Sequence, residues 1–213
     1  MDQGVDPVER AAQFLRAAVA GMHRDSAREP IRWPDASGAF PADFLLRPPP
    51  VVVDANILRN DVLRSCRTGQ RTVLVTAANA GLLRMFCAEH VYQEVIEHSG
   101  DWTASGPITR DCFLGNWLSE YLPLLRIVKI NEGQLGWLDP VELTRARELA
   151  AKDPDDVPSA VLALLLRAFF LSHDGPALRA VYGQTDLSEH QHWVDLLKAA
   201  AMRARWRSTS PFS

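Results

Sequence analysis

The chain has 213 residues, of which 47% are hydrophobic and 23% are charged, so its composition is that of a folded globular protein rather than a disordered one. This length corresponds to one domain, or to one domain with extensions, and no apolar run approaches the roughly 20 residues that a membrane-spanning helix needs. The net charge of −3 excludes a chain that is basic as a whole, so a phosphate-binding surface would have to be local.

The N-terminus and the cysteines indicate the compartment. Residues Met1 to Gly4 lack the basic-then-apolar pattern of a secretion signal. Cys66, Cys87 and Cys112 are widely spaced and form no C-x-x-C pair, which fits buried thiols in a reducing cytosol better than disulfides or zinc ligands. We therefore expect a soluble cytoplasmic protein that has no membrane partner.

The N-terminal part differs in character from the rest of the chain. Asp6 to about Met22 is a predicted helix, because Asp6 can cap it and Pro7 suits its first position. Six of the 14 prolines then lie between Pro30 and Pro50, which predicts an extended connector. We expect three parts: a helical extension with a proline-rich connector (1–47), a compact domain (48–182), and a C-terminal helix with a basic tail (183–213).

Predicted strands and helices alternate through the compact domain. Short β-branched or alternating runs predict strands at Val51–Val53, Val73–Val75, Met85–Ala88, Arg126–Ile130 and Ala168–Ser172. Apolar residues at helical spacing predict helices at Ile57–Cys66, Val91–His98, Pro140–Lys152, Pro158–Arg167 and Ser188–Trp206, with helical pieces between Trp102 and Leu125. This alternation predicts a three-layer α/β/α sandwich with a central parallel sheet and helical N- and C-terminal extensions.

Two of the predicted strands are followed by an aspartate. Asp54 ends the run that contains Val51–Val53, and Asp174 follows Ala168–Ser172. Ligands of open parallel sheets bind outside the carboxyl ends of the strands, and an aspartate there must be solvated, paired or bound to metal. Asn56, two residues after Asp54, can hold that carboxylate in place. The alternative is that each aspartate simply forms a turn.

Further acids lie in the Asp153-Pro154-Asp155-Asp156 stretch and at Glu94. The aspartates precede a predicted helix, where carboxylates are favoured by about 0.3–1 kcal/mol each, so capping is the simpler interpretation. Three aspartates exceed what capping requires, however. Glu94 lies on a predicted helix and, taken alone, is typical of an exposed helix residue.

The order of these motifs resembles that of the PIN-domain nuclease family, from about Pro50 to Leu178. The matching features are a strand followed by Asp-x-Asn, then Val-x-x-Glu-Val, then Asp-x-x-Asp before an alanine- and leucine-rich helix, then a strand followed by Ser-x-Asp. The resemblance implies that four acids gather at one end of the sheet and bind Mg²⁺ or Mn²⁺: Asp54, Glu94, Asp156 and Asp174. Asp153 is an alternative to Asp156. We prefer Asp156, because it falls seven residues before Ala163, which is the spacing usual in the family's alanine-rich helix. Asn56 and Ser172 match the small polar residues that orient the acids.

The expected chemistry follows from charge. Carboxylates within a few ångströms of one another repel by about 4 kcal/mol per close pair at an effective dielectric near 20, so the cluster needs protons or a divalent cation. Oxygen ligands select hard cations such as Mg²⁺ or Mn²⁺ over zinc. Together with this chemistry, the resemblance implies a metal-dependent endoribonuclease that hydrolyses RNA phosphodiester bonds. Arg59, Arg64 and Arg67 are candidates to contact the RNA backbone, and the alternative is that they form a solvated helix face.

Other classes fit less well. A strand–Asp-x-Asp phosphatase needs an aspartate where Asn56 stands, and no dinucleotide or P-loop motif occurs. A non-catalytic PIN-like module that binds RNA or protein remains the alternative. Many short proteins of the resembled family are toxins that an antitoxin holds in check, so the expected partners are RNA, an antitoxin protein and a second copy of the chain.

Overall fold

The computed structural model describes residue 48 and residues 50–183. The helix predicted between Asp6 and Met22, most of the proline-rich connector, and the C-terminal helix with its basic tail lie outside the described residues. No helix in the described part is both long and apolar enough to cross a membrane.

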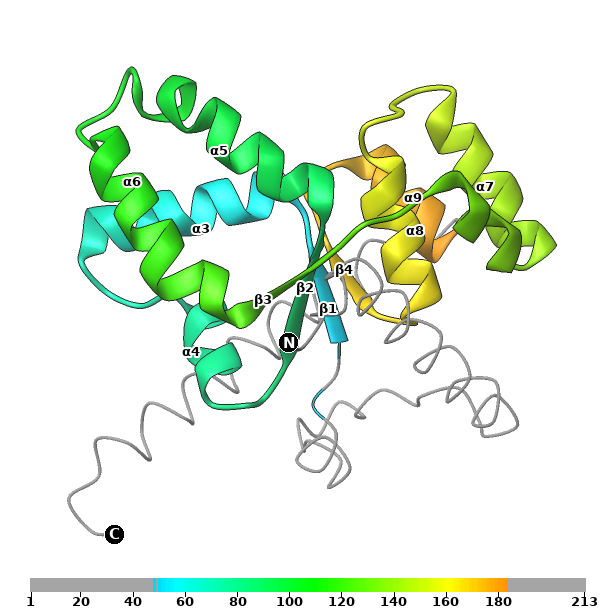
Figure 1. Cartoon of the computed structure of the whole chain (residues 1–213), viewed down its shortest axis with the longest axis horizontal. Coiled ribbons are helices and arrows are strands. Elements are labelled where there is room, and N and C mark those ends of the chain that lie inside the picture. Colours follow the sequence, from blue (N-terminus) through cyan, green and yellow to red (C-terminus); the bar gives the residue numbers. More distant parts are fainter. Residues whose placement is uncertain (1–47, 49, 184–213) are drawn as a thin grey trace, which may run out of the picture. The chain divides into compact units, whose positions relative to one another are not determined.

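A four-stranded parallel sheet forms the centre of the described residues, in the order β3-β2-β1-β4. Figure 1 shows these strands at the centre, between two groups of helices. In chain order they are β1 (Pro50–Val53), β2 (Arg84–Ala88), β3 (Leu125–Val128) and β4 (Phe169–Leu171). Both faces of the central strands are buried, which explains why β1 reads as a continuous valine run rather than as an alternating one.

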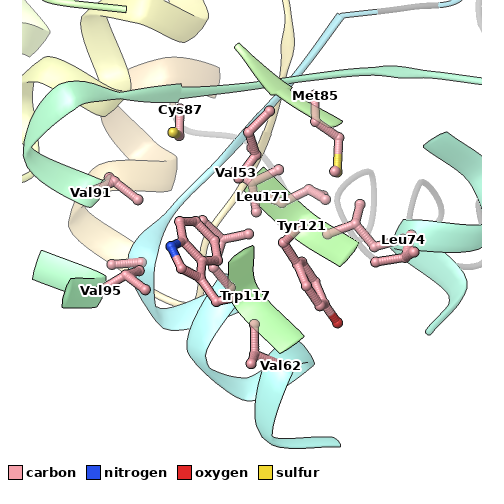
Figure 2. Close-up of a cluster of buried hydrophobic side chains, with 14 of the residues drawn as sticks. Val53, Val62, Leu74, Met85, Cys87, Val91, Val95, Trp117, Tyr121 and Leu171 are labelled. Carbon is pink, nitrogen blue, oxygen red and sulfur yellow. The ribbon is translucent and has the colours of Figure 1, made fainter. Parts of the chain in front are cut away.

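Helices that follow β1 and β2 cover one face of the sheet (Figure 1). They are α3 (Ala55–Thr68), α4 (Val73–Asn79), α5 (Glu89–Thr103) and α6 (Arg110–Asn116), followed by a π-helical turn, η1 (Trp117–Tyr121), and a 3₁₀ turn, η2 (Leu122–Leu124). Trp117 and Tyr121 from the π turn are fully buried and stack with ring centroids 6.3 Å apart. Figure 2 shows both rings in the core beside Val53 and Leu171 of the strands.

The opposite face is covered by the second group of helices. This group comprises η3 (Glu132–Trp137), α7 (Pro140–Ala150), α8 (Val157–Leu165) and α9 (Gly175–Tyr182). Helix α8 packs directly on the sheet, and Ser159 to Leu165 are all buried. A capping box of Asp139 and Glu142 begins α7. The predicted three-layer α/β/α sandwich is confirmed for the described residues.

One predicted strand is wrong. Val73–Val75 begins helix α4, because the Thr72 side chain caps the helix by accepting a hydrogen bond from the Val75 backbone N–H. A three-residue apolar run fits a strand and a buried helix turn equally well, so only the cap distinguishes them.

The burial predicted for the cysteines is correct for Cys87 only. Burial raises the pKa of the Cys87 thiol to about 12. Cys66 is half-buried, Cys112 is exposed, and all three are free thiols.

Candidate active site

The strand order places a topological switch point between β1 and β4. From β1 the chain moves to β2 and β3 on one side, and it then returns to β4 on the other side of β1. The segments after β1 and β4 therefore diverge onto opposite faces, with α3 on one and α9 on the other. Ligands of open α/β sheets bind in the crevice that such a divergence leaves. Asp54 and Asp174 flank this point.

Asp54 is held by three hydrogen bonds at the end of β1. One carboxylate oxygen accepts from the Ala55 backbone N–H at 2.8 Å, and this bond caps α3. The other accepts from Asn56 Nδ2 at 2.8 Å and from Ser172 Oγ at 2.6 Å. The residue is 3% exposed, so its orientation is set by neighbours rather than by water. Asn56 and Ser172 thus orient Asp54, as the resemblance implies.

The same two polar residues connect the ends of β1 and β4. Ser172 Oγ accepts from the Asp174 backbone N–H at 2.9 Å, and Asn56 Oδ1 accepts from the His173 backbone N–H at 3.0 Å. The Asp54 backbone N–H also donates to the Leu171 carbonyl at 3.0 Å. Both aspartates are therefore placed by one network at the rim of the sheet.

Asp174 also begins a helix. One of its carboxylate oxygens accepts from the Ala177 backbone N–H at 2.7 Å and caps α9. Among the described residues no hydrogen bond reaches its second oxygen. The turn-forming role considered for this residue is thus real, and it leaves one oxygen for other chemistry.

Asp156 occupies the N-cap position of α8, yet its side chain makes no capping hydrogen bond. Burial, together with the negative charges of four other acids, raises its pKa to about 7; the four are Asp54, Asp153, Asp174 and Glu94. Helix capping therefore does not account for this carboxylate. Its electrostatic neighbours are the acids that the motif order selected, including its own alternative, Asp153.

Glu94 faces the same group of acids from α5. Burial raises its pKa, as do the charges of Asp54, Asp155 and Asp153, while His98 lowers it. It is half-buried rather than exposed. The simpler interpretation of Glu94 as an exposed helix residue is therefore wrong.

His90 is a residue of this site that sequence reasoning missed. It lies four residues before Glu94, on the same face of α5. Burial lowers its pKa, against the opposing charges of Asp54 and Asp155. Its Nε2 is 3.4 Å from Ser159 Oγ, and its Nδ1 is buried without a hydrogen-bond partner. The signal that could have found it is the i, i+4 spacing of His90 and Glu94.

The three predicted RNA-binding arginines are not gathered at the acids. Arg59 lies over the Trp102 ring, with its guanidinium carbon 5.6 Å from the ring centroid. Arg64 and Arg67 are exposed near the other end of α3, about 14 and 18 Å along the helix from its first residue at 1.5 Å per residue.

The fit to a divalent cation rests on donor chemistry and charge. The acids supply only oxygen donors, which suit Mg²⁺ or Mn²⁺; burial and, after it, the charges of neighbouring acids raise the pKa of Asp156, and a cation would neutralise those charges. In residues 50–183 no three acidic, histidine or cysteine side chains stand close enough to enclose an ion as they lie. Asp54, Glu94, Asp156 and Asp174 are the residues that would hold one.

The fold and the site together define a class of protein, namely an α/β sandwich with carboxylates at its switch point. Comparison of the chain with protein-family models, with curated proteins and with solved structures found no match.

Proposed function

We propose that the chain is a divalent-metal-dependent endoribonuclease of the PIN-like type, which hydrolyses RNA phosphodiester bonds. The observation that carries the proposal is that acids from four separate segments lie within electrostatic reach of one another near the switch point, where their charges add to the rise that burial causes in the pKa of Asp156. Residues more than a hundred positions apart contribute to this one group.

A structural role alone does not explain this arrangement. Like charges in a half-buried setting repel one another, and each carboxylate loses hydration on burial. Helix capping accounts for one carboxylate oxygen of Asp54 and for one of Asp174. It accounts for neither Asp156 nor Glu94, whose carboxylates make no hydrogen bond within the described residues. A cation that binds all four acids would offset the repulsion.

The chain's own residues have distinct roles in this proposal. Asp54, oriented by Ser172 and Asn56, and Asp174, with its free oxygen, are the direct metal ligands. Asp156 and Glu94 complete the ligand set, or they accept the proton of the attacking water, since their raised pKa values make them better bases than ordinary carboxylates. A bound Mg²⁺ or Mn²⁺ would supply the positive charge that stabilises the phosphate oxygens as the bond breaks.

The proposed setting is the cytoplasm, where the chain acts as the toxin of a toxin–antitoxin pair. An antitoxin peptide that carries positive charge would be attracted to the acids and would block access to them. A second copy of the chain is the other proposed protein partner.

Cleavage of a pool of cellular RNAs tests the proposal. Purified full-length protein with Mn²⁺ should cut RNA at defined positions, which end mapping would identify. Asp174→Ala should lose this activity while it keeps the far-ultraviolet circular dichroism of the wild type. Intact RNA with both proteins would show that the chain is not a ribonuclease under these conditions and would remove the nuclease proposal.

A non-catalytic RNA- or protein-binding module is the second candidate, and one observation favours it. Both carboxylate oxygens of Asp54 already have hydrogen-bond partners, so this residue is satisfied without metal. The two candidates differ in their response to Mn²⁺. The nuclease should melt at a higher temperature with Mn²⁺ and Asp54→Asn should not, whereas a scaffold module should respond in neither form.

A further inference from the structure

A groove of about 300 Å³ lies between α7 and α9. Arg145, Leu149 and Lys152 line it from α7 and its C-terminal end, and their spacing places them on one face of the helix. Pro176 and Arg179 line it from α9. The groove is therefore formed by one side-chain stripe from each helix.

The groove is rich in cationic side chains that form no ion pair within the described part of the chain. Arg145, Lys152 and Arg179 line it together with a single carboxylate, Glu148. Within residues 50–183 none of the three cations forms an ion pair. The Nε atom of Arg145 is moreover buried without a hydrogen-bond partner. A buried donor that lacks an acceptor is unfavourable, and an anionic ligand would satisfy it.

The positions of Arg145 and Arg179 relative to two glycines show how the groove runs along α9. Arg145 Nη1 lies 2.7 Å from the position that a Cβ would take on Gly183, so Arg145 is at the C-terminal end of α9. Arg179 turns back toward the start of α9, where its Nη1 is 3.4 Å from the corresponding position on Gly175. Lys152 lies seven residues beyond Arg145, about 10 Å further along the helix direction.

This direction leads to the acids. Lys152 immediately precedes Asp153, and Gly175 immediately follows Asp174. One end of the cationic groove therefore adjoins the two segments that bring aspartates to the switch point. A strand of RNA with its reacting phosphate at the acids could continue into the groove with its next phosphates.

We propose that the α7–α9 groove binds backbone phosphates of single-stranded RNA beside the cleavage position, an inference that rests on the proposed nuclease function. Lys152 and Arg179 contact the phosphates nearest the acids, and Arg145 contacts a phosphate further away. Such contacts carry no base information, so they give affinity and direction rather than sequence choice. The groove also supplies local positive charge in a chain whose net charge is −3.

Fluorescence anisotropy of a labelled single-stranded RNA tests the groove. The full chain is titrated in Ca²⁺, and a gel run after the titration checks that the RNA is intact. Arg179→Gln and Lys152→Gln should each weaken binding about tenfold, the effect of one lost charge-assisted contact. Each should also reduce the slope of log K against log salt by about 0.7, the value for one phosphate contact on a single strand.

Arg147→Gln is the matched control, because Arg147 is exposed on α7 but does not line the groove. It removes the same charge and should leave the affinity within about twofold and the slope unchanged. Groove variants that behave like Arg147→Gln would overturn the proposal, and so would a wild-type chain that does not bind RNA.

The cleavage assay separates this proposal from the nuclease function. RNA that is cut with Mn²⁺, at wild-type efficiency in both groove variants, would refute the groove and leave the nuclease. RNA that is bound through the groove but never cut would support the groove as a binding site and refute the nuclease.

Discussion

The Ser172 hydroxyl joins the two strand-end aspartates. It donates to Asp54 Oδ2 at 2.6 Å and accepts from the Asp174 backbone N–H at 2.9 Å, and the residue is fully buried. No water replaces a bond that is lost at such a position, so this one side chain links the geometry of β1 to that of β4.

Ser172→Ala should lower the free energy of unfolding by about 1–3 kcal/mol, because it leaves the Asp174 backbone N–H without its acceptor and removes one of the two hydrogen bonds to Asp54 Oδ2. RNA cleavage should fall as well, since Asp54 loses one of its constraints. Urea denaturation and cleavage rates measure the two effects. Ser119→Ala, at an exposed position of η1, should change stability by no more than about 0.5 kcal/mol. Equal stability of the two variants would contradict the structural role of Ser172.

A half-buried acid, Asp61, lies away from the candidate site. Its Oδ2 accepts from Thr72 Oγ1 at 2.5 Å and from Tyr121 OH at 3.0 Å, which ties α3 to α4 and to η1. Burial raises the pKa of Asp61 above its ordinary value of 3.8, although both hydrogen bonds and Arg64 oppose the shift. The folded chain therefore holds this proton at a pH where the unfolded chain has released it.

This proton has a measurable effect on stability. Between pH 3.8 and the raised pKa of Asp61, the folded state binds more protons than the unfolded state, so the free energy of unfolding falls as pH rises. Asp61→Asn does not titrate and keeps an acceptor for Thr72 and Tyr121. Urea denaturation at several pH values should show the wild type losing stability relative to Asp61→Asn across this window. A difference that stays constant with pH would show that Asp61 titrates alike in both states.

At the scale of elements, capping residues set the helix ends that the apolar periodicity of the sequence does not determine. The apolar pattern predicted a helix over Ile57–Cys66, whereas α3 begins directly after Asp54 and ends before Gly69. Asp54 caps its start, and Gly69 closes it in the left-handed conformation with φ of 61°. The helix therefore begins at the candidate site itself, which fixes the direction of Asp54.

Two glycine substitutions should have opposite effects. Gly69→Ala places a Cβ in the left-handed region and should destabilise the fold by about 1–2 kcal/mol. Gly100→Ala lies inside α5 with no atom within 4 Å of the new Cβ and should stabilise it by about 0.5–1 kcal/mol. Thermal or urea denaturation measures both. A stabilising Gly69→Ala would show that the end of α3 does not need its positive φ.

At the scale of the whole molecule, folding forces acids from distant segments together. Asp156 feels four other carboxylates, and it lies 102 positions from Asp54 in the sequence. The metal-free chain must then bear a repulsion that the unfolded chain does not. Stability and the candidate function therefore conflict at this rim of the sheet.

Asp156→Asn should stabilise the fold, because it removes one of the carboxylates that repel one another. In EDTA the variant should melt about 2–4 °C above the wild type, which corresponds to roughly 1 kcal/mol after allowance for solvent screening. Added Mn²⁺ should raise the melting temperature of the wild type but raise that of the variant much less. Calorimetry measures both, with Asp111→Asn, an exposed residue of α6, as the control for one lost charge. A variant that is less stable than the wild type in EDTA would contradict the repulsion.

Local patterns in the sequence were sufficient for most of the described fold. Buried valines and phenylalanines predicted β1 and β4, alternation predicted β3, and the order of strands and helices predicted the parallel sandwich. These features depend on residues close together in the chain, for which burial and periodicity are direct signals. Asp54, Asp174 and their polar neighbours were found for the same reason, since each follows a recognisable strand.

Tertiary packing decided what no local pattern contains. It placed β4 beside β1 rather than beside β3, and this choice brings Asp174 to Asp54. It made Val73–Val75 a helix turn, because contacts with Asp61 and Tyr121 hold the Thr72 hydroxyl that caps this helix. It also packed α7 against α9 to form the cationic groove, and it surrounded His90 with acids. Each outcome depends on which distant surfaces meet, because free energy is gained only when both partners are buried together.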